Sequence, residues 1–86
     1  MLELGKVFFT PGALLTIPLG FSYSALQRHA SGDWGDVSKD DWKENDFAVK
    51  NGERVISSYH APNGKKFWII TEWDRSYTTV LLPEEY

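Results

Sequence analysis

The sequence predicts a small α+β protein in which a C-terminal three-stranded antiparallel sheet packs against two to three short helices. Three observations lead to this class. A chain of 86 residues has room for one hydrophobic core, so residues 1–86 form a single domain. Its apolar residues recur with a helical period of about 3.6 before residue 52. From residue 54 onward they alternate with the period of about 2 that is typical of strands.

The first elements are short. Residues 6–10 are expected to form an N-terminal strand that would extend the sheet, because β-favouring residues occupy its centre. Thr10 then suits a helix N-cap and Pro11 the first helical position, which predicts a short helix over 13–15. The segment 17–20 contains both Pro and Gly and is expected to end that helix.

A second helix is predicted to begin at Ser24, which forms a capping box with Gln27, and to end at Gly32. Arg28 and His29 would lie in its last turn, where positive charge suits the helix dipole. The residues expected to share its apolar face are Tyr23, Leu26 and Ala30.

The third helix has the most complete set of signals. Ser38 is its predicted N-cap and Asp41 completes a capping box, while Asn51-Gly52 supplies a left-handed stop. Val37, just before the cap, is expected to contact Trp42 as a hydrophobic staple. The residues expected on or beside its inward face are Trp42, Phe47 and Val49.

The strands follow. The runs 54–59 and 66–73 are rich in β-formers, and the sequence Ala-Pro-Asn-Gly over 61–64 fits a type I turn with a G1 bulge. That turn fixes the register of the hairpin, so that Tyr59 faces Phe67. The other predicted pairs are Ala61–Lys65, Ser57–Ile69 and Val55–Thr71 on the core side, and Ile56–Ile70 and Arg54–Glu72 on the opposite side. A third strand is predicted over 76–82.

Composition restricts the function. The chain has no cysteine, which suits a reducing cytosol and excludes a thiolate metal site. It has no apolar run of membrane-spanning length, so we expect a soluble cytoplasmic protein. Its net charge is −3 and its nine basic residues are scattered, which disfavours direct nucleic-acid binding. The aromatic content of 15% suggests a small core rich in large rings together with a partner surface.

Several blocks of sequence resemble a known family. They are Arg28-His29 followed by 32–36, the segment 54–59, and the segments 68–75 and 78–86. Together they resemble short bacterial proteins described as plasmid-related and sometimes as modification subunits of type I restriction enzymes. A modification subunit needs parallel βαβ units around a nucleotide cofactor, which a short chain with an antiparallel sheet cannot supply. The resemblance therefore implies an association with plasmids or mobile DNA, with no defined activity.

The first candidate site combines His29 with Asp33 and Asp36 near the glycine-rich loop. A histidine and two carboxylates can form a general-base pair or part of a metal site. In the alternative interpretation His29 caps its helix, and the two carboxylates brace a turn around Trp34.

The second candidate is the turn after residue 71, which carries Glu72, Asp74 and Arg75. An arginine at a loop tip can bind a carboxylate or phosphate. Alternatively, Asp74 caps the turn and Arg75 forms an ion pair with Asp33 or Asp36. If the two regions meet, the catalytic candidates His29, Asp33, Asp74 and Arg75 form one polar cluster.

These patterns leave three functional hypotheses. The first is a non-enzymatic accessory protein that binds another protein through an exposed sheet face or edge strand, without a cofactor. Its candidate binding residues are Trp34, Trp68, Trp73 and Arg75. The alternative is a small hydrolase or metal-dependent enzyme that uses the His/Asp/Arg cluster. The third is a structural homodimer joined edge to edge.

Overall fold

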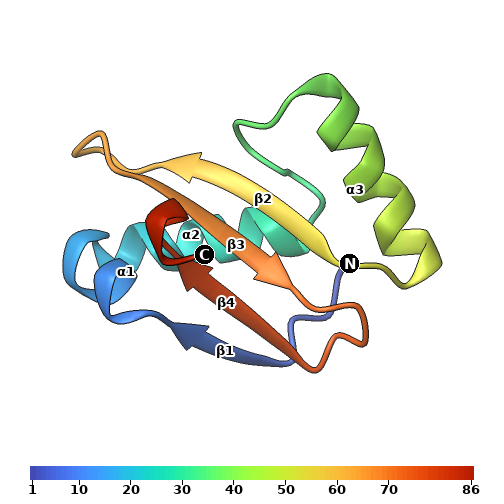
Figure 1. The fold of residues 1–86 in the computed structure, drawn as a ribbon, viewed down its shortest axis with the longest axis horizontal. Helices are drawn as coiled ribbons and strands as arrows, with labels where there is room; N and C mark the ends of the chain where they lie inside the picture. Colours follow the sequence, from blue (N-terminus) through green and yellow to red (C-terminus); the bar gives the residue numbers. More distant parts are fainter.

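The computed structural model describes all residues, Met1–Tyr86, and confirms the α+β class (Figure 1). The elements are β1 (Lys6–Phe9), α1 (Pro11–Thr16), α2 (Leu19–Ala30), α3 (Lys39–Asn51), β2 (Val55–His60), β3 (Lys66–Thr71), β4 (Tyr77–Leu81) and the 3₁₀ helix η1 (Pro83–Glu85). The four strands form one sheet in the order β1-β4-β3-β2. Because β1 runs parallel to β4, the sheet is mixed and not purely antiparallel.

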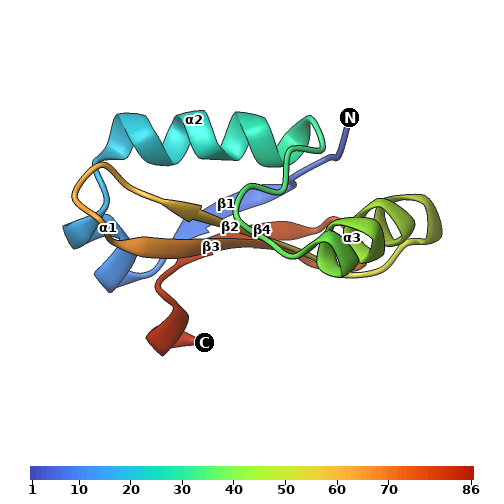
Figure 2. The same ribbon diagram turned by 90° about the horizontal axis from the view of Figure 1, so that it is seen from above.

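The sheet has two unequally covered faces. Figure 2 shows α2 lying across one face, which we call the inner face, and the short η1 on the other, which we call the outer face. The inner face carries the main core, which includes Tyr59, Phe67, Ile69 and Val80. Val55 is also buried and packs in a second, smaller cluster with Leu2, Trp34 and Ala48. α3 lies beside the free side of β2, level with the sheet. None of the helices is both long and apolar enough to span a membrane.

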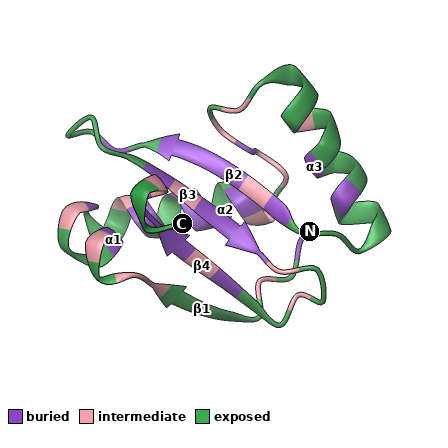
Figure 3. Cartoon of the chain, in the orientation of Figure 1, coloured by how far each residue is buried: buried purple, intermediate pink, exposed green.

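The predicted hairpin register is confirmed. Tyr59 pairs with Phe67, and the other core-side pairs and the Ile56–Ile70 pair also form as expected. The Ala61 N–H donates to the Lys65 carbonyl over 2.8 Å, which closes the turn. Figure 3 shows that β3 and most of β2 are buried, whereas β1 is largely exposed.

The short first helix is confirmed, but the second begins earlier than predicted. The Thr10 side chain accepts a hydrogen bond from the Ala13 N–H, as an N-cap does. α2 begins at Leu19, so Ser24 lies inside it and caps nothing. The Pro18 carbonyl accepts the first helical hydrogen bonds, and the extra turns place Phe21 against Phe67 in the core. Burial of that additional surface outweighs the capping preference of Ser24.

The ends of α3 were predicted correctly, and its inward face was predicted correctly only at Trp42, which packs with Val37 against the cluster around Trp34 and Ala48. Ser38 accepts a hydrogen bond from the Asp41 N–H, and Gly52 adopts φ +67°. The buried residues of the helix are Asn45 and Ala48, whereas Phe47 and Val49 are exposed. α3 packs beside a strand edge, whose backbone needs hydrogen bonds, so a polar side chain faces inward.

Candidate functional site

His29 lies in the last turn of α2, and it is fully buried in the core. Its Nδ1 is 2.5 Å from Ser57 Oγ, and its Nε2 is 2.8 Å from Thr71 Oγ1. The hydrogen bonds continue from Thr71 to Thr78 Oγ1 over 2.7 Å, and Thr78 donates to the Leu4 carbonyl over 2.7 Å. The histidine therefore links α2 to three strands, and it does not cap its helix.

Burial determines the charge state of this histidine. Desolvation, and secondarily the positive charge of Arg75, lower the pKa of His29 to about 4. The ring is neutral at pH 7, with one nitrogen donating and the other accepting. A neutral imidazole enclosed by the protein cannot reach a substrate, so its role in this geometry is structural.

Asp33 and Asp36 lie outside the core and bind different partners. Asp33 pairs with the Arg28 guanidinium at 2.8 Å and accepts from the Gly35 N–H, so it braces the loop around Trp34 as the structural alternative expected. The hydrogen bond from Arg28 holds the pKa of Asp33 below its usual value. Asp36 instead contacts His60, with Oδ2 at 2.6 Å from Nδ1.

Arg75 fixes backbone and does not pair with Asp33 or Asp36. Its guanidinium donates to the carbonyls of Ala48 at 2.9 Å, Glu53 at 2.6 Å and Glu72 at 3.2 Å. Its own backbone has φ +60°, in the left-handed region. Arg75 thus ties the β3–β4 turn to the end of α3.

Asp74 accepts two hydrogen bonds from Ser76, as the capping interpretation predicted. The expected contact between Arg54 and Glu72 also forms, at 3.6 Å. His29, Asp33, Asp74 and Arg75 therefore each have separate partners, and no contact joins them into one polar cluster. Nor do any three His, Asp or Glu side chains lie close enough together to hold a metal ion.

The tryptophans differ in their environments. Trp34 is buried and donates its indole N–H to Asp46 Oδ1 over 3.0 Å, so it belongs to the core and cannot contact a partner. Trp73 is 66% exposed on the β3–β4 turn. Trp68 is half-buried on the outer face and packs edge-on against Tyr86, with ring centroids 5.7 Å apart.

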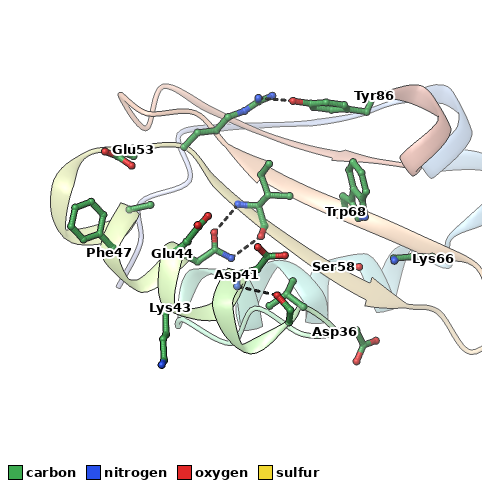
Figure 4. A pocket seen from close by; sticks show the side chains of 16 residues that line it. Asp36, Asp41, Lys43, Glu44, Phe47, Glu53, Ser58, Lys66, Trp68 and Tyr86 are labelled. Atoms are coloured by element: carbon green, nitrogen blue, oxygen red, sulfur yellow. Dashed lines mark hydrogen bonds between the residues drawn. The ribbon is translucent and has the colours of Figure 1, made fainter.

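A groove of about 950 Å³ lies between α3 and the outer face, and Trp68 forms part of its lining (Figure 4). We call it the α3 groove. Its apolar residues are Val37, Phe47, Ala48, Ile56, Trp68 and Tyr86. On the sheet side, Arg54 stacks over the Tyr86 ring at 5.2 Å and donates to its hydroxyl over 2.7 Å.

Charged side chains surround this apolar centre. Asp41 and Glu44 lie on the α3 side and Lys66 on the sheet side, and none of the three forms an ion pair within the chain. At the floor, Ser58 Oγ is buried and has no hydrogen-bond partner. The α3 groove therefore offers an apolar surface, unpaired charges of both signs and one unsatisfied hydroxyl group.

Sequence reasoning identified only Trp68 among the main groove residues. The contribution of Tyr86 depends on the fold of η1 back across the sheet, which no local pattern indicates. For His29 a signal existed, because Ser57 and Thr71 place two hydroxyl groups on the predicted core side, and buried hydroxyl groups require polar partners.

Comparison of the chain with protein-family models, with curated proteins and with solved structures gave no match. Function is therefore inferred from the geometry of the chain itself.

Proposed function

We propose that this protein is a non-enzymatic interaction domain that binds a segment of another protein in the α3 groove. Following the resemblance of its sequence blocks, we further propose that it acts in the cytoplasm as an accessory factor of plasmids or other mobile DNA. The absence of cysteine is consistent with that compartment.

The composition of the groove is the observation that carries the proposal. Protein interfaces combine an apolar, aromatic-rich centre with a polar rim, and tryptophan, tyrosine and arginine dominate their binding energy. Trp68, Tyr86 and Arg54 occur together on one side of the groove and contact each other in series. Unpaired Asp41, Glu44 and Lys66 line the rim, where they can select a partner by charge.

The geometry gives less support to the enzyme alternative. His29 is enclosed in the core, and the exposed His60–Asp36 pair has no nucleophile bonded to it. Ser58 Oγ, two residues from His60 on the same strand, makes no hydrogen bond to it. The net charge of −3 likewise does not favour nucleic acid as the partner.

Selection of peptides on the folded protein tests the proposal. A displayed library of random peptides is selected on the immobilised chain, and the enriched peptides are measured by fluorescence anisotropy. We expect Trp68→Ala to weaken their binding at least about tenfold, because it removes a central aromatic contact. The matched control Trp73→Ala removes an exposed tryptophan outside the groove and should leave binding unchanged.

Two results would contradict the proposal. One is a failure of the wild-type chain to enrich any peptide. The other is equal binding of the enriched peptides to wild type and to Trp68→Ala, when circular dichroism shows that both proteins are folded.

A further inference from the structure

The two edge strands of the sheet, β2 and β1, differ in whether their outward backbone groups are hydrogen-bonded. Those of Ile56 and Ser58 in β2 already have partners within the chain. The Asn45 side chain donates to the Ile56 carbonyl over 2.7 Å and accepts from the Ile56 N–H at 3.3 Å. The Ser58 N–H donates to the Trp34 carbonyl over 3.1 Å, and the Ser58 carbonyl accepts from the Asp36 N–H at 2.7 Å. No further strand can pair with β2 without displacing these bonds.

The β1 edge is open. The N–H groups of Lys6 and Thr10 donate to carbonyls of the β4 segment over 3.1 and 3.0 Å. Because successive N–H groups of a strand point to opposite sides, those of Val7 and Phe9 point away from the sheet. No loop or side chain bonds to them, and Figure 1 shows no element beyond β1.

Exposed apolar side chains surround this open edge. Val7 is 38% exposed and Phe8 51%, and Tyr77 of β4 is 41% exposed beside Phe8. On the inner side, Tyr23 of α2 is 54% exposed and packs edge-on against Phe9. Unpaired strand edges with apolar side chains are templates for pairing with another chain.

We infer that β1 pairs antiparallel with β1 of a second copy of this chain, joining the two four-stranded sheets. A twofold axis perpendicular to the sheet produces this pairing and keeps the inner faces of both copies on the same side. Residues opposite each other must then come from the same face, which restricts the register to pairs such as Val7–Phe9 or Val7–Val7.

The backbone conformation of β1 and of Gly5 before it distinguishes between these two registers. When Val7 faces Phe9 of the second copy, each pair exchanges two hydrogen bonds through the outward groups, and Phe8 faces its own equivalent at the axis. Val7 facing Val7 would place Gly5 in the ladder, and Gly5 has φ +62°, outside the strand conformation. The first register is therefore the one that β1 can form.

The chemistry of this register favours a second copy as the occupant. The central pair is phenylalanine with phenylalanine, an aromatic cross-strand contact that stabilises antiparallel strands. Lys6 faces Thr10 of the second copy, so no like charges are opposed. A strand of four residues buries little surface, and we expect weak, concentration-dependent association.

Sedimentation and amide exchange test the inference on the wild-type chain. The sedimenting mass should rise from monomer to dimer with concentration. Over the same range, exchange of the Val7 and Phe9 amides should slow, because those amides become hydrogen-bonded only in the dimer. A monomer at every concentration, or fast exchange of both amides in concentrated samples, would overturn the inference.

A charge swap tests the register. Phe8→Lys and Phe8→Glu each place like charges opposite one another at the axis, so each variant alone should be monomeric. An equal mixture of the two should dimerise, because lysine then faces glutamate. The control Trp73→Lys changes an exposed aromatic residue on the β3–β4 turn, outside β1 and its predicted pairs, and should dimerise as wild type does. Dimerisation of either Phe8 variant alone, or none in the mixture, would refute this register.

The inference does not depend on the proposed peptide binding. The α3 groove lies beside β2, at the opposite edge of the sheet from β1. Loss of dimerisation in the Phe8 variants should therefore leave peptide binding intact, and Trp68→Ala should leave dimerisation intact.

Discussion

Acidification from about pH 7 to about pH 4.5 is predicted to destabilise the protein mainly through His29. The pKa of this histidine is about 4 in the folded protein, compared with the ordinary histidine value of 6.5 expected in the unfolded chain. Between these values the unfolded chain binds more protons than the folded one, so stability falls as the pH falls. The contribution is fully present above about pH 6.5 and is lost toward about pH 4.

The magnitude follows from the difference between the two pKa values. Each pKa unit corresponds to about 1.4 kcal/mol, so the full loss is about 3 kcal/mol, of which about 2 kcal/mol has occurred by about pH 4.5. A domain of this size has a total unfolding free energy of roughly 4–13 kcal/mol. The pKa values of Asp33, Asp74 and Glu85 are lowered in the folded state, so these carboxylates add their own losses mainly at more acidic pH.

Urea unfolding at closely spaced pH values measures this effect. His29→Gln keeps a donor and an acceptor but cannot titrate, so its unfolding free energy should be nearly flat over the window in which wild type loses about 2 kcal/mol. The control is His60→Gln, which removes the second histidine of the chain, an exposed one, and should retain the wild-type slope. An equal slope in wild type and His29→Gln would refute the assignment.

Two further predictions concern the backbone around β2, and each has a matched control. Gly35→Ala should cost at least about 3 kcal/mol, because Gly35 has φ +73° and a Cβ there would lie 2.1 Å from a β2 carbonyl oxygen. Gly52→Ala, at φ +67° but in open space, should cost only about 1 kcal/mol in the same thermal melts, and equal losses would contradict the steric argument. Asn45→Ala should cost about 1–3 kcal/mol and promote aggregation measured by light scattering, because it uncovers a strand edge. The control Asn51→Ala removes one exposed hydrogen bond, from the Asn51 side chain to the Phe47 carbonyl, and should cause neither the stability loss nor the aggregation. Aggregation of both variants would argue against protection of the strand edge by Asn45.

Local signals predicted much of the fold. The caps at Thr10, Ser38 and Gly52 and the register set by the turn at 61–64 depend on interactions within a few residues, and all are present. Such features are visible in sequence because their chemistry is local.

The features that failed depend on contacts distant in sequence. The start of α2 is set by burial against β3, and the inward face of α3 is set by the backbone needs of β2. The parallel pairing of β1 with β4 joins residues near opposite ends of the sequence.

The same distance explains the result for the candidate site. His29 was a catalytic candidate because histidine is a common catalytic residue. Its structural role depends on hydrogen bonds to Ser57 and Thr71, which lie far away in sequence and meet it only in the folded core. The groove on the outer face was anticipated only through Trp68, because α3 and η1 complete it from two separate parts of the chain.

The strand order also has a consequence for synthesis. β1 is made first, yet the strand it pairs with, β4, is the last to be made. A nascent chain leaving the ribosome therefore carries the apolar segment Val7-Phe8-Phe9 without its sheet partner while the intervening helices and strands are translated. Segments of this kind bind chaperones or aggregate until their partner arrives. Because of this strand order, the chain is most prone to aggregation during its synthesis, before β4 is available to pair with β1.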